Sequence, residues 1–150
     1  MPKSRRYVFI LWGDNFEETV AAIFVSQLRE AGLRVKVVSV NRQQTCGAHG
    51  LALVPDLTLT QAMPLAQQTA CVIVPCEFRV MQHLKQDPRL REFFDLARSH
   101  QAKVVIGPLH DSHAEDFEPL PLSPETVTIY PAEEDLVEFA RQVAGSLLRY

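Results

Sequence analysis

The chain alternates between short, continuous apolar runs and longer segments in which apolar residues recur at helical spacing. The clearest run is YVFILW at 7–12, which shows no polar alternation and is too short to span a membrane. Such a run predicts a strand buried on both faces, typical of the centre of a parallel sheet. The same reasoning predicts strands at 34–40, 70–75, 103–107 and 126–130.

Helical spacing predicts helices between these strands, at 20–31, 78–84, 88–100 and 134–148. Gly32 suits the position just after a helix end, and Pro88 suits a first helical turn. The remaining segments predict a hairpin at 46–54, a loop with a short helical turn at 57–68 and a loop at 109–124. Strands that alternate with helices predict an α/β, three-layer sandwich. Its mostly parallel, flavodoxin-like sheet has the strand order 2-1-3-4-5 and helices on both faces.

The first predicted helix is apolar over most of its circumference. One face contains Val20, Ile23, Phe24 and Leu28, and Ala21, Ala22 and Val25 widen it. A helix of this kind needs burial on two sides, and the sheet supplies only one of them. We therefore predict a homodimer that pairs through Val20–Ala31.

Composition narrows the class of protein. The 150 residues predict one domain, 1–150, with 47% hydrophobic and 22% charged residues and a net charge of −3. The only cluster of basic residues is at Lys3, Arg5 and Arg6, which gives no footprint for nucleic acid. The apolar run that follows is shorter than a secretory signal core, so we expect a cytoplasmic protein with no membrane association. Three cysteines without CxxC spacing argue against a disulfide framework or a zinc knuckle, and no cofactor is predicted.

Ligands of open α/β sheets bind at the carboxyl ends of the strands. This rule predicts a crevice for a small-molecule ligand, formed by Gly13, Asp14, Glu17, Cys76, Glu77, Gly107 and His110.

Four residues are candidates for chemistry: Cys76, Glu17, Glu18 and His110. Cys76 follows a strand, and two interpretations of it are open. Its thiol could lie in the crevice with a depressed pKa, or it could be a small, partly buried group without reactivity. Glu17 and Glu18 would be a carboxylate pair with one raised pKa, or acidic residues that complement a helix N-terminus.

The segment HDSHAED at 110–116 contains residue types that bind zinc and other transition metals, above all His110 and His113. The alternative is a solvated polar loop, and the lack of a second ligand cluster favours that interpretation, so no metal site is predicted. His49 lies between two glycines and is interpreted as a turn residue, and Cys46 and Cys71 as hairpin or core residues.

The order of these segments resembles the ThiJ/PfpI superfamily, which has a class I glutamine-amidotransferase-like fold. The matching stretches cover about two thirds of the chain: VFIL at 8–11 with FEE at 16–18, AGLRV at 31–35, LALVPDLTL at 51–59, CVIVP at 71–75 and residues 102–108. The resemblance implies a nucleophilic cysteine at a sharp elbow after the fourth predicted strand. It also implies a glutamate at the first strand–helix junction and a glycine pair after the third strand.

At the corresponding positions the chain differs from the family pattern. Gly107 stands at the place of the cysteine, and Cys76 and Glu77 stand at the glycine pair. Counting back from Gly32 without gaps places the family glutamate at Val20, whereas a shift of two residues would place it at Glu18. The chain is also shorter than typical members after Gly107.

These differences favour a non-catalytic ThiJ/PfpI-like domain that binds a ligand or a partner. The alternative is a cysteine-dependent hydrolase, a glyoxalase-type enzyme or a redox sensor that uses Cys76, with His110 or His113 as the base.

Overall fold

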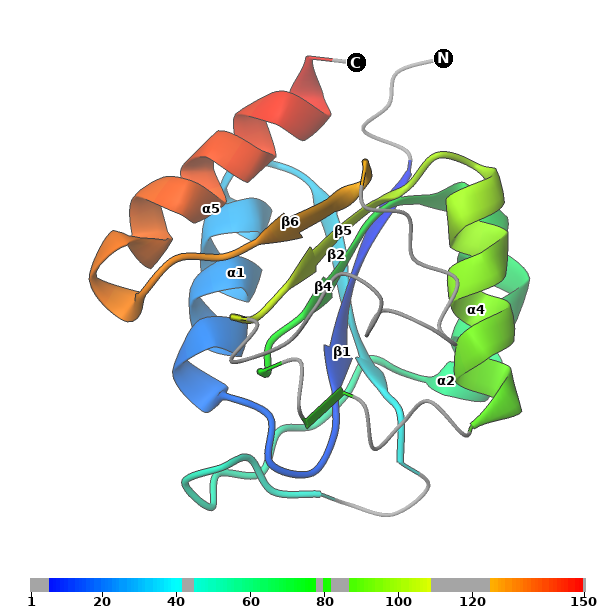
Figure 1. Cartoon of the computed structure of the whole chain (residues 1–150), viewed down its shortest axis with the longest axis horizontal. Helices are drawn as coiled ribbons and strands as arrows, with labels where there is room; N and C mark the ends of the chain where they lie inside the picture. The colour runs from blue at the N-terminus through cyan, green and yellow to red at the C-terminus, as the bar shows by residue number, and fades with distance from the viewer. Residues whose placement is uncertain (1–5, 42–44, 78–79, 82–86, 109–124, 150) are drawn as a thin grey trace.

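The computed structural model describes residues 6–41, 45–77, 80–81, 87–108 and 125–149 (Figure 1). The helix predicted at 78–84 lies mostly outside these residues, and the loop predicted at 109–124 lies entirely outside them.

A six-stranded parallel sheet forms the centre of the molecule (Figure 1). Its spatial order is β3-β2-β1-β4-β5-β6, and every described pairing is parallel. The strands are β1 (Tyr7–Trp12), β2 (Arg34–Ser39), β3 (Leu57–Thr58), β4 (Thr69–Val74), β5 (Lys103–Ile106) and β6 (Val127–Ile129). The five predicted strands and their order are confirmed, and β1 lies inside the sheet as expected for its continuous apolar sequence.

Helices cover both faces of this sheet. They are α1 (Glu18–Glu30), α2 (Leu59–Ala62), the 3-10 helix η2 (Met63–Gln68), α4 (Pro88–Ser99) and α5 (Glu133–Leu148). In Figure 1, α1 and α5 lie on one side of the strands and α2 and α4 on the other. This arrangement is the predicted three-layer α/β sandwich.

The core lies on both sides of β1, whose residues Val8–Trp12 are almost completely buried. On one face Phe9 packs edge-on against Phe93 of α4, with 5.6 Å between ring centroids. The opposite helix layer contains the edge-on pair of Phe24 and Phe139, which joins α1 to α5 at 6.2 Å. Burial on both faces explains why β1 has no polar alternation.

Two elements differ from the prediction. The segment at 57–68, expected to be a loop with a helical turn, begins with the short edge strand β3 and continues through α2 and η2. Thr58 and Gln61 form a capping box that starts α2. The predicted hairpin at 46–54 is present as one antiparallel bridge between Cys46 and Ala52.

The second face of α1 packs against α5 of the same chain (Figure 1). Besides the ring contact, Arg141 Nε of α5 donates a hydrogen bond to Gln27 Oε1 of α1 at 3.1 Å. The predicted homodimer relied on an apolar surface that the sheet alone would leave uncovered, and α5 covers much of that surface. Ala22 remains exposed and Val25 partly exposed, so pairing of two chains stays a prediction.

Candidate functional site

Three loops meet at the carboxyl edge of the sheet, after β1, β4 and β5. The backbone N–H of Glu17 donates to the carbonyl oxygen of Pro75 at 2.7 Å. The N–H of Gly107 donates to the carbonyl oxygen of Cys76 at 3.1 Å. These two bonds hold Glu17, Cys76 and Gly107 together, as the topology predicts.

Gly107 occupies a position in which no side chain fits. A Cβ atom built there would lie 2.1 Å from the carbonyl oxygen of Cys76 and 2.8 Å from the hydroxyl oxygen of Tyr130. The φ angle of Gly107 is not positive, so glycine is required here by close approach and not by backbone conformation.

The hydroxyl group of Tyr130 donates a hydrogen bond to Glu17 Oε2 at 2.5 Å. Tyr130 directly follows β6, and its side chain is buried at 3% exposure. Burial raises the pKa of Tyr130 far above its usual range, and the Glu17 carboxylate raises it further. Tyr130 is therefore a neutral hydrogen-bond donor at neutral pH.

Cys76 is 1% exposed and lies where the loops after β4 and β5 meet. Burial raises the pKa of its thiol strongly, and the nearby charges of Glu17 and Glu77 raise it further. The interpretation of Cys76 as a thiol with a depressed pKa is wrong, because a thiolate is disfavoured here.

Glu18 points away from this cluster and holds the hairpin. Its Oε2 accepts hydrogen bonds from the backbone N–H groups of His49 at 2.7 Å and Leu51 at 3.1 Å. Its Oε1 lies 3.2 Å from His49 Nδ1, and a Cβ at Gly47 would be 2.5 Å from the Glu18 carboxyl carbon. Burial alone would raise the pKa of Glu18, but these hydrogen bonds lower it to about 2. Of the two interpretations, the carboxylate pair with one raised pKa is therefore wrong for Glu18. Glu18 lies in the first turn of α1, as the other interpretation expected, and it also fastens the hairpin.

The remaining crevice candidates make no hydrogen bond to Glu17 among those that the structure describes, or lie outside the described residues. Gly13 packs against Val40, and the backbone N–H of Asp14 donates to Asn41 Oδ1 at 3.2 Å. Glu77 is partly exposed. His110 and His113 fall outside the described residues, and within those residues no group of three metal-binding side chains comes together.

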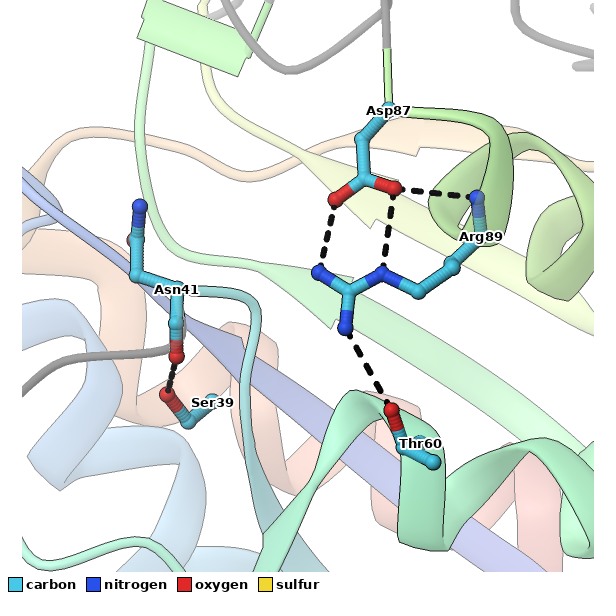
Figure 2. A network of polar contacts seen from close by, with 5 residues as sticks. All are labelled: Ser39, Asn41, Thr60, Asp87 and Arg89. Carbon is cyan, nitrogen blue, oxygen red and sulfur yellow. Dashed lines mark hydrogen bonds and ion pairs between the residues drawn. The ribbon is translucent and has the colours of Figure 1, made fainter.

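A second polar cluster, which the sequence did not indicate, joins α4 to α2 (Figure 2). Asp87 accepts from the backbone N–H of Arg89 at 2.9 Å and caps α4. The Arg89 guanidinium pairs with the Asp87 carboxylate at 3.0 Å and donates to Thr60 Oγ1 of α2 at 3.3 Å. Arg89 holds the pKa of Asp87 below its usual range. Because every charge in this cluster has a partner, we interpret it as structural.

Comparison with known proteins identifies the family. A model of the DJ-1/PfpI family matches residues 6–106, more than half of the chain. The chain belongs to the DJ-1/PfpI family. This result confirms the family level of the ThiJ/PfpI resemblance.

Three solved structures are similar to this chain in fold. Drosophila melanogaster DJ-1beta is 13% identical with a TM-score of 0.77, over 97% of this chain and 91% of that one. A cysteine-to-alanine mutant of a DJ-1 superfamily protein from Salmonella typhimurium is 16% identical with a TM-score of 0.75, over 96% and 91%. The putative protease I from Bacteroides thetaiotaomicron is 12% identical with a TM-score of 0.75, over 95% and 99%. No curated protein matches the chain in sequence.

In this DJ-1/PfpI chain, the Tyr130 hydroxyl lies between the Glu17 carboxylate and the Gly107 position. Both Glu17 Oε2 and the Cβ position of Gly107 lie within 3 Å of the Tyr130 hydroxyl oxygen. Val20, where counting placed the family glutamate, is instead a buried core residue of α1. α1 begins at Glu18, so Glu17 directly precedes its first residue.

Sequence reasoning missed Tyr130, which appeared only as the last residue of a predicted strand. The usable signal was its place directly after a strand, since parallel strands bring such positions to one edge.

In the described part of the chain, no helix has both the length and the apolar character needed to cross a membrane.

Proposed function

We propose that this chain is a non-catalytic DJ-1/PfpI domain that acts by binding a small-molecule ligand or a partner. The observation that carries the proposal is the steric closure at Gly107. The family resemblance places a nucleophilic cysteine at this elbow, and here even a Cβ atom would collide with the backbone of Cys76. Gly107 has no side-chain atom that could act as a nucleophile, and the surrounding atoms leave no space for one.

The other thiol in the cluster does not replace the missing nucleophile. Cys76 is buried, and its pKa is raised by burial and by two carboxylates. A nucleophilic or redox-sensing cysteine needs the opposite environment, partly exposed and electropositive. No observation therefore favours the alternative of a Cys76-dependent enzyme or redox sensor.

The proposed ligand site is the carboxyl edge around Glu17, Cys76, Gly107 and Tyr130. Open α/β folds bind ligands at this edge. The Glu17 carboxylate and the Tyr130 hydroxyl supply directional polar groups against an apolar background, as binding sites commonly do.

The experiment that tests this proposal combines activity and labelling. We expect the purified protein to show no turnover of amides, peptides or methylglyoxal above the buffer rate, and the Cys76→Ser variant to behave identically. Under native conditions iodoacetamide should modify the exposed Cys46 and leave the buried Cys71 and Cys76 unmodified, as read by mass spectrometry. Turnover that disappears in Cys76→Ser, together with rapid labelling of Cys76, would refute the proposal.

Assembly as a homodimer through α1 is the second part of the proposal. The support is the apolar surface that α5 leaves, with Ala22 exposed and Ile23 and Val25 partly exposed. A two-fold interface contains the same residues from both chains, so one substitution places two like charges in it. Ala22→Glu should therefore convert a dimer to a monomer with its fold intact. Sedimentation velocity at tens of micromolar measures this shift, with the exposed substitution Glu30→Gln as the control. An unmodified protein that sediments as a monomer contradicts this part.

A further inference from the structure

We propose that a second copy of this chain docks on a surface that α1 forms together with residues 51–54, and not on α1 alone. We call this surface the composite face, and it consists of Ala22, Val25, Leu51, Ala52 and Val54. The inference rests on the proposed homodimer and deepens it. It adds a second element to the interface and assigns the residue of α1 that holds the two elements together.

The segment 51–56 is tied to α1 at two points. At one end Glu18, the first residue of α1, accepts a hydrogen bond from the backbone N–H of Leu51 at 3.1 Å. At the other end Arg29, in the last turn of α1, donates to Asp56 Oδ2 at 2.9 Å. The segment between these ties therefore runs beside α1 from its first turn to its last.

The side chains between the two ties project outward. Spacings of three and four residues place Ala22 and Val25 on the same stripe of α1 as the two tied helix residues. Ala22 is exposed and Val25 is partly exposed. In the segment, Leu53 packs against the core, whereas Ala52 and Val54 on either side of it are exposed. The helix stripe and the segment therefore present small and aliphatic side chains to solvent side by side.

The segment is also the most exposed apolar part of the described residues. Four large apolar side chains are exposed there, and two of them, Leu51 at 54% and Val54 at 89%, lie in this segment. The other two, Ile129 and Leu148, belong to β6 and α5. Neighbouring exposed apolar side chains mark an interaction surface, whereas single ones need no explanation.

No charged residue interrupts the composite face. Residues 19–27 of α1 and residues 46–55 contain no Asp, Glu, Lys or Arg. The helix α4, with 12 residues against 13 in α1, is the contrasting case. It exposes four charged side chains, Arg91, Glu92, Asp95 and Arg98. The central parts of protein interfaces are depleted in charge in the same way as the composite face.

The lack of charge indicates a second copy as the occupant. Across a two-fold axis the same surface of both chains meets, so a charge near the axis lies close to its own like. A face without charge avoids this repulsion. A charged partner, such as nucleic acid or an acidic peptide, would instead be matched by charges of the opposite sign, and the composite face has none.

Glu18 acts on this interface through the segment and is a positioning residue. Its side chain is only 8% exposed, so it does not itself meet the second copy. Its carboxylate fixes the backbone N–H groups of His49 and Leu51. Without these bonds the segment would have to be ordered during association, which weakens binding.

The test introduces a charge into the segment and measures the dissociation constant of the dimer by sedimentation velocity over a dilution series. Val54→Lys should raise this constant at least about tenfold. Its far-UV circular dichroism should stay unchanged, because the Val54 side chain is 89% exposed. Leu148→Lys is the matched control, since Leu148 is an exposed aliphatic residue at the end of α5, where a lysine is favourable. It should leave the dissociation constant unchanged.

The positioning role of Glu18 is tested in the same assay. Glu18→Ala should raise the dissociation constant at least about tenfold, and Glu18→Gln, which keeps an acceptor oxygen, should raise it less. If Glu18 acts through the segment, Glu18→Ala should add little to the effect of Val54→Lys in the double variant. A merely structural role would lower the stability of these variants and leave the association of the folded chains unchanged.

The outcomes separate this inference from the proposed function. A dimer that Ala22→Glu breaks and Val54→Lys does not, or equal effects of Val54→Lys and Leu148→Lys, overturn the composite face and leave the homodimer through α1 in place. An unchanged dissociation constant in Glu18→Ala overturns the positioning role. A wild-type protein that stays monomeric at tens of micromolar overturns the homodimer as well and leaves the face to a different apolar partner. Catalytic turnover, which refutes the non-catalytic function, is measured separately from association.

Discussion

Replacing Gly107 with alanine should destabilise the protein by roughly 3 kcal/mol, and cysteine should cost at least as much. The reason is a collision between the new Cβ and the backbone of Cys76, at 2.1 Å from its carbonyl oxygen. To relieve the contact, the loops after β4 and β5 must separate, which breaks the bond from the Gly107 N–H to Cys76. Thermal melting measures the effect, and for a domain of this size each kcal/mol corresponds to about 2–4 °C.

Gly145→Ala is the matched control for this measurement. Gly145 lies inside α5, and a Cβ there would meet only Arg149 Nη2 at an ordinary 3.5 Å. Alanine should raise stability by about 0.4–1 kcal/mol at such a site, because it restricts the unfolded chain. If Gly107→Ala melts at the wild-type temperature, the close approach at the elbow does not exist in solution.

The Gly107→Cys variant should also gain no activity, although it restores the element that the family resemblance implies. The sequence alone attributes this outcome to a missing carboxylate at Val20. The structure gives a different reason, which is the lack of space for a side chain at Gly107. The new thiol would have to displace either the Cys76 backbone or the Tyr130 hydroxyl. Turnover of methylglyoxal by this single variant would show that the elbow accommodates a nucleophile.

The sequence predicted the fold well because the signals are local. Continuous apolar runs marked the buried strands, and helical spacing marked α1, α4 and α5. The strand β3 was not predicted, because a strand of two residues shows no periodicity in the sequence. Periodicity also showed that α1 has two buried faces, but it did not show that α5, more than a hundred residues later, packs against the second face.

The site was predictable only in its location. Topology placed Glu17, Cys76 and Gly107 at one edge, and the structure brings them together. The contact between Tyr130 and Glu17 joins positions 113 residues apart, and nothing in the sequence pairs them. The direction of the pKa shift at Cys76 depends on burial, and that of Glu18 depends on backbone donors 31 and 33 residues away. Such environments arise from tertiary packing.

The largest expected effect of pH concerns Glu18 and the hairpin it holds. Its pKa is lowered from 4.5 to about 2 in the folded protein, where the backbone N–H groups of Leu51 and His49 favour the carboxylate over the opposing effect of burial. A group with a depressed folded pKa contributes stability that is present above its unfolded pKa. This contribution is lost as the pH falls from about 4.5 towards about 2. Glu18→Gln should therefore lower the denaturant midpoint at pH 7 and flatten its fall between these pH values.

The hairpin provides a local readout that separates this mechanism from general acid denaturation. The amides of His49 and Leu51 donate directly to Glu18, so their hydrogen exchange should accelerate in Glu18→Gln while exchange in β1 stays slow. Glu30→Gln is the matched control, because Glu30 is exposed at the other end of α1. It should change neither the midpoint nor hairpin exchange. Unchanged protection of His49 and Leu51 in Glu18→Gln would mean that the hairpin is held by other contacts, such as the bond from the Ala48 N–H to the Phe16 carbonyl oxygen.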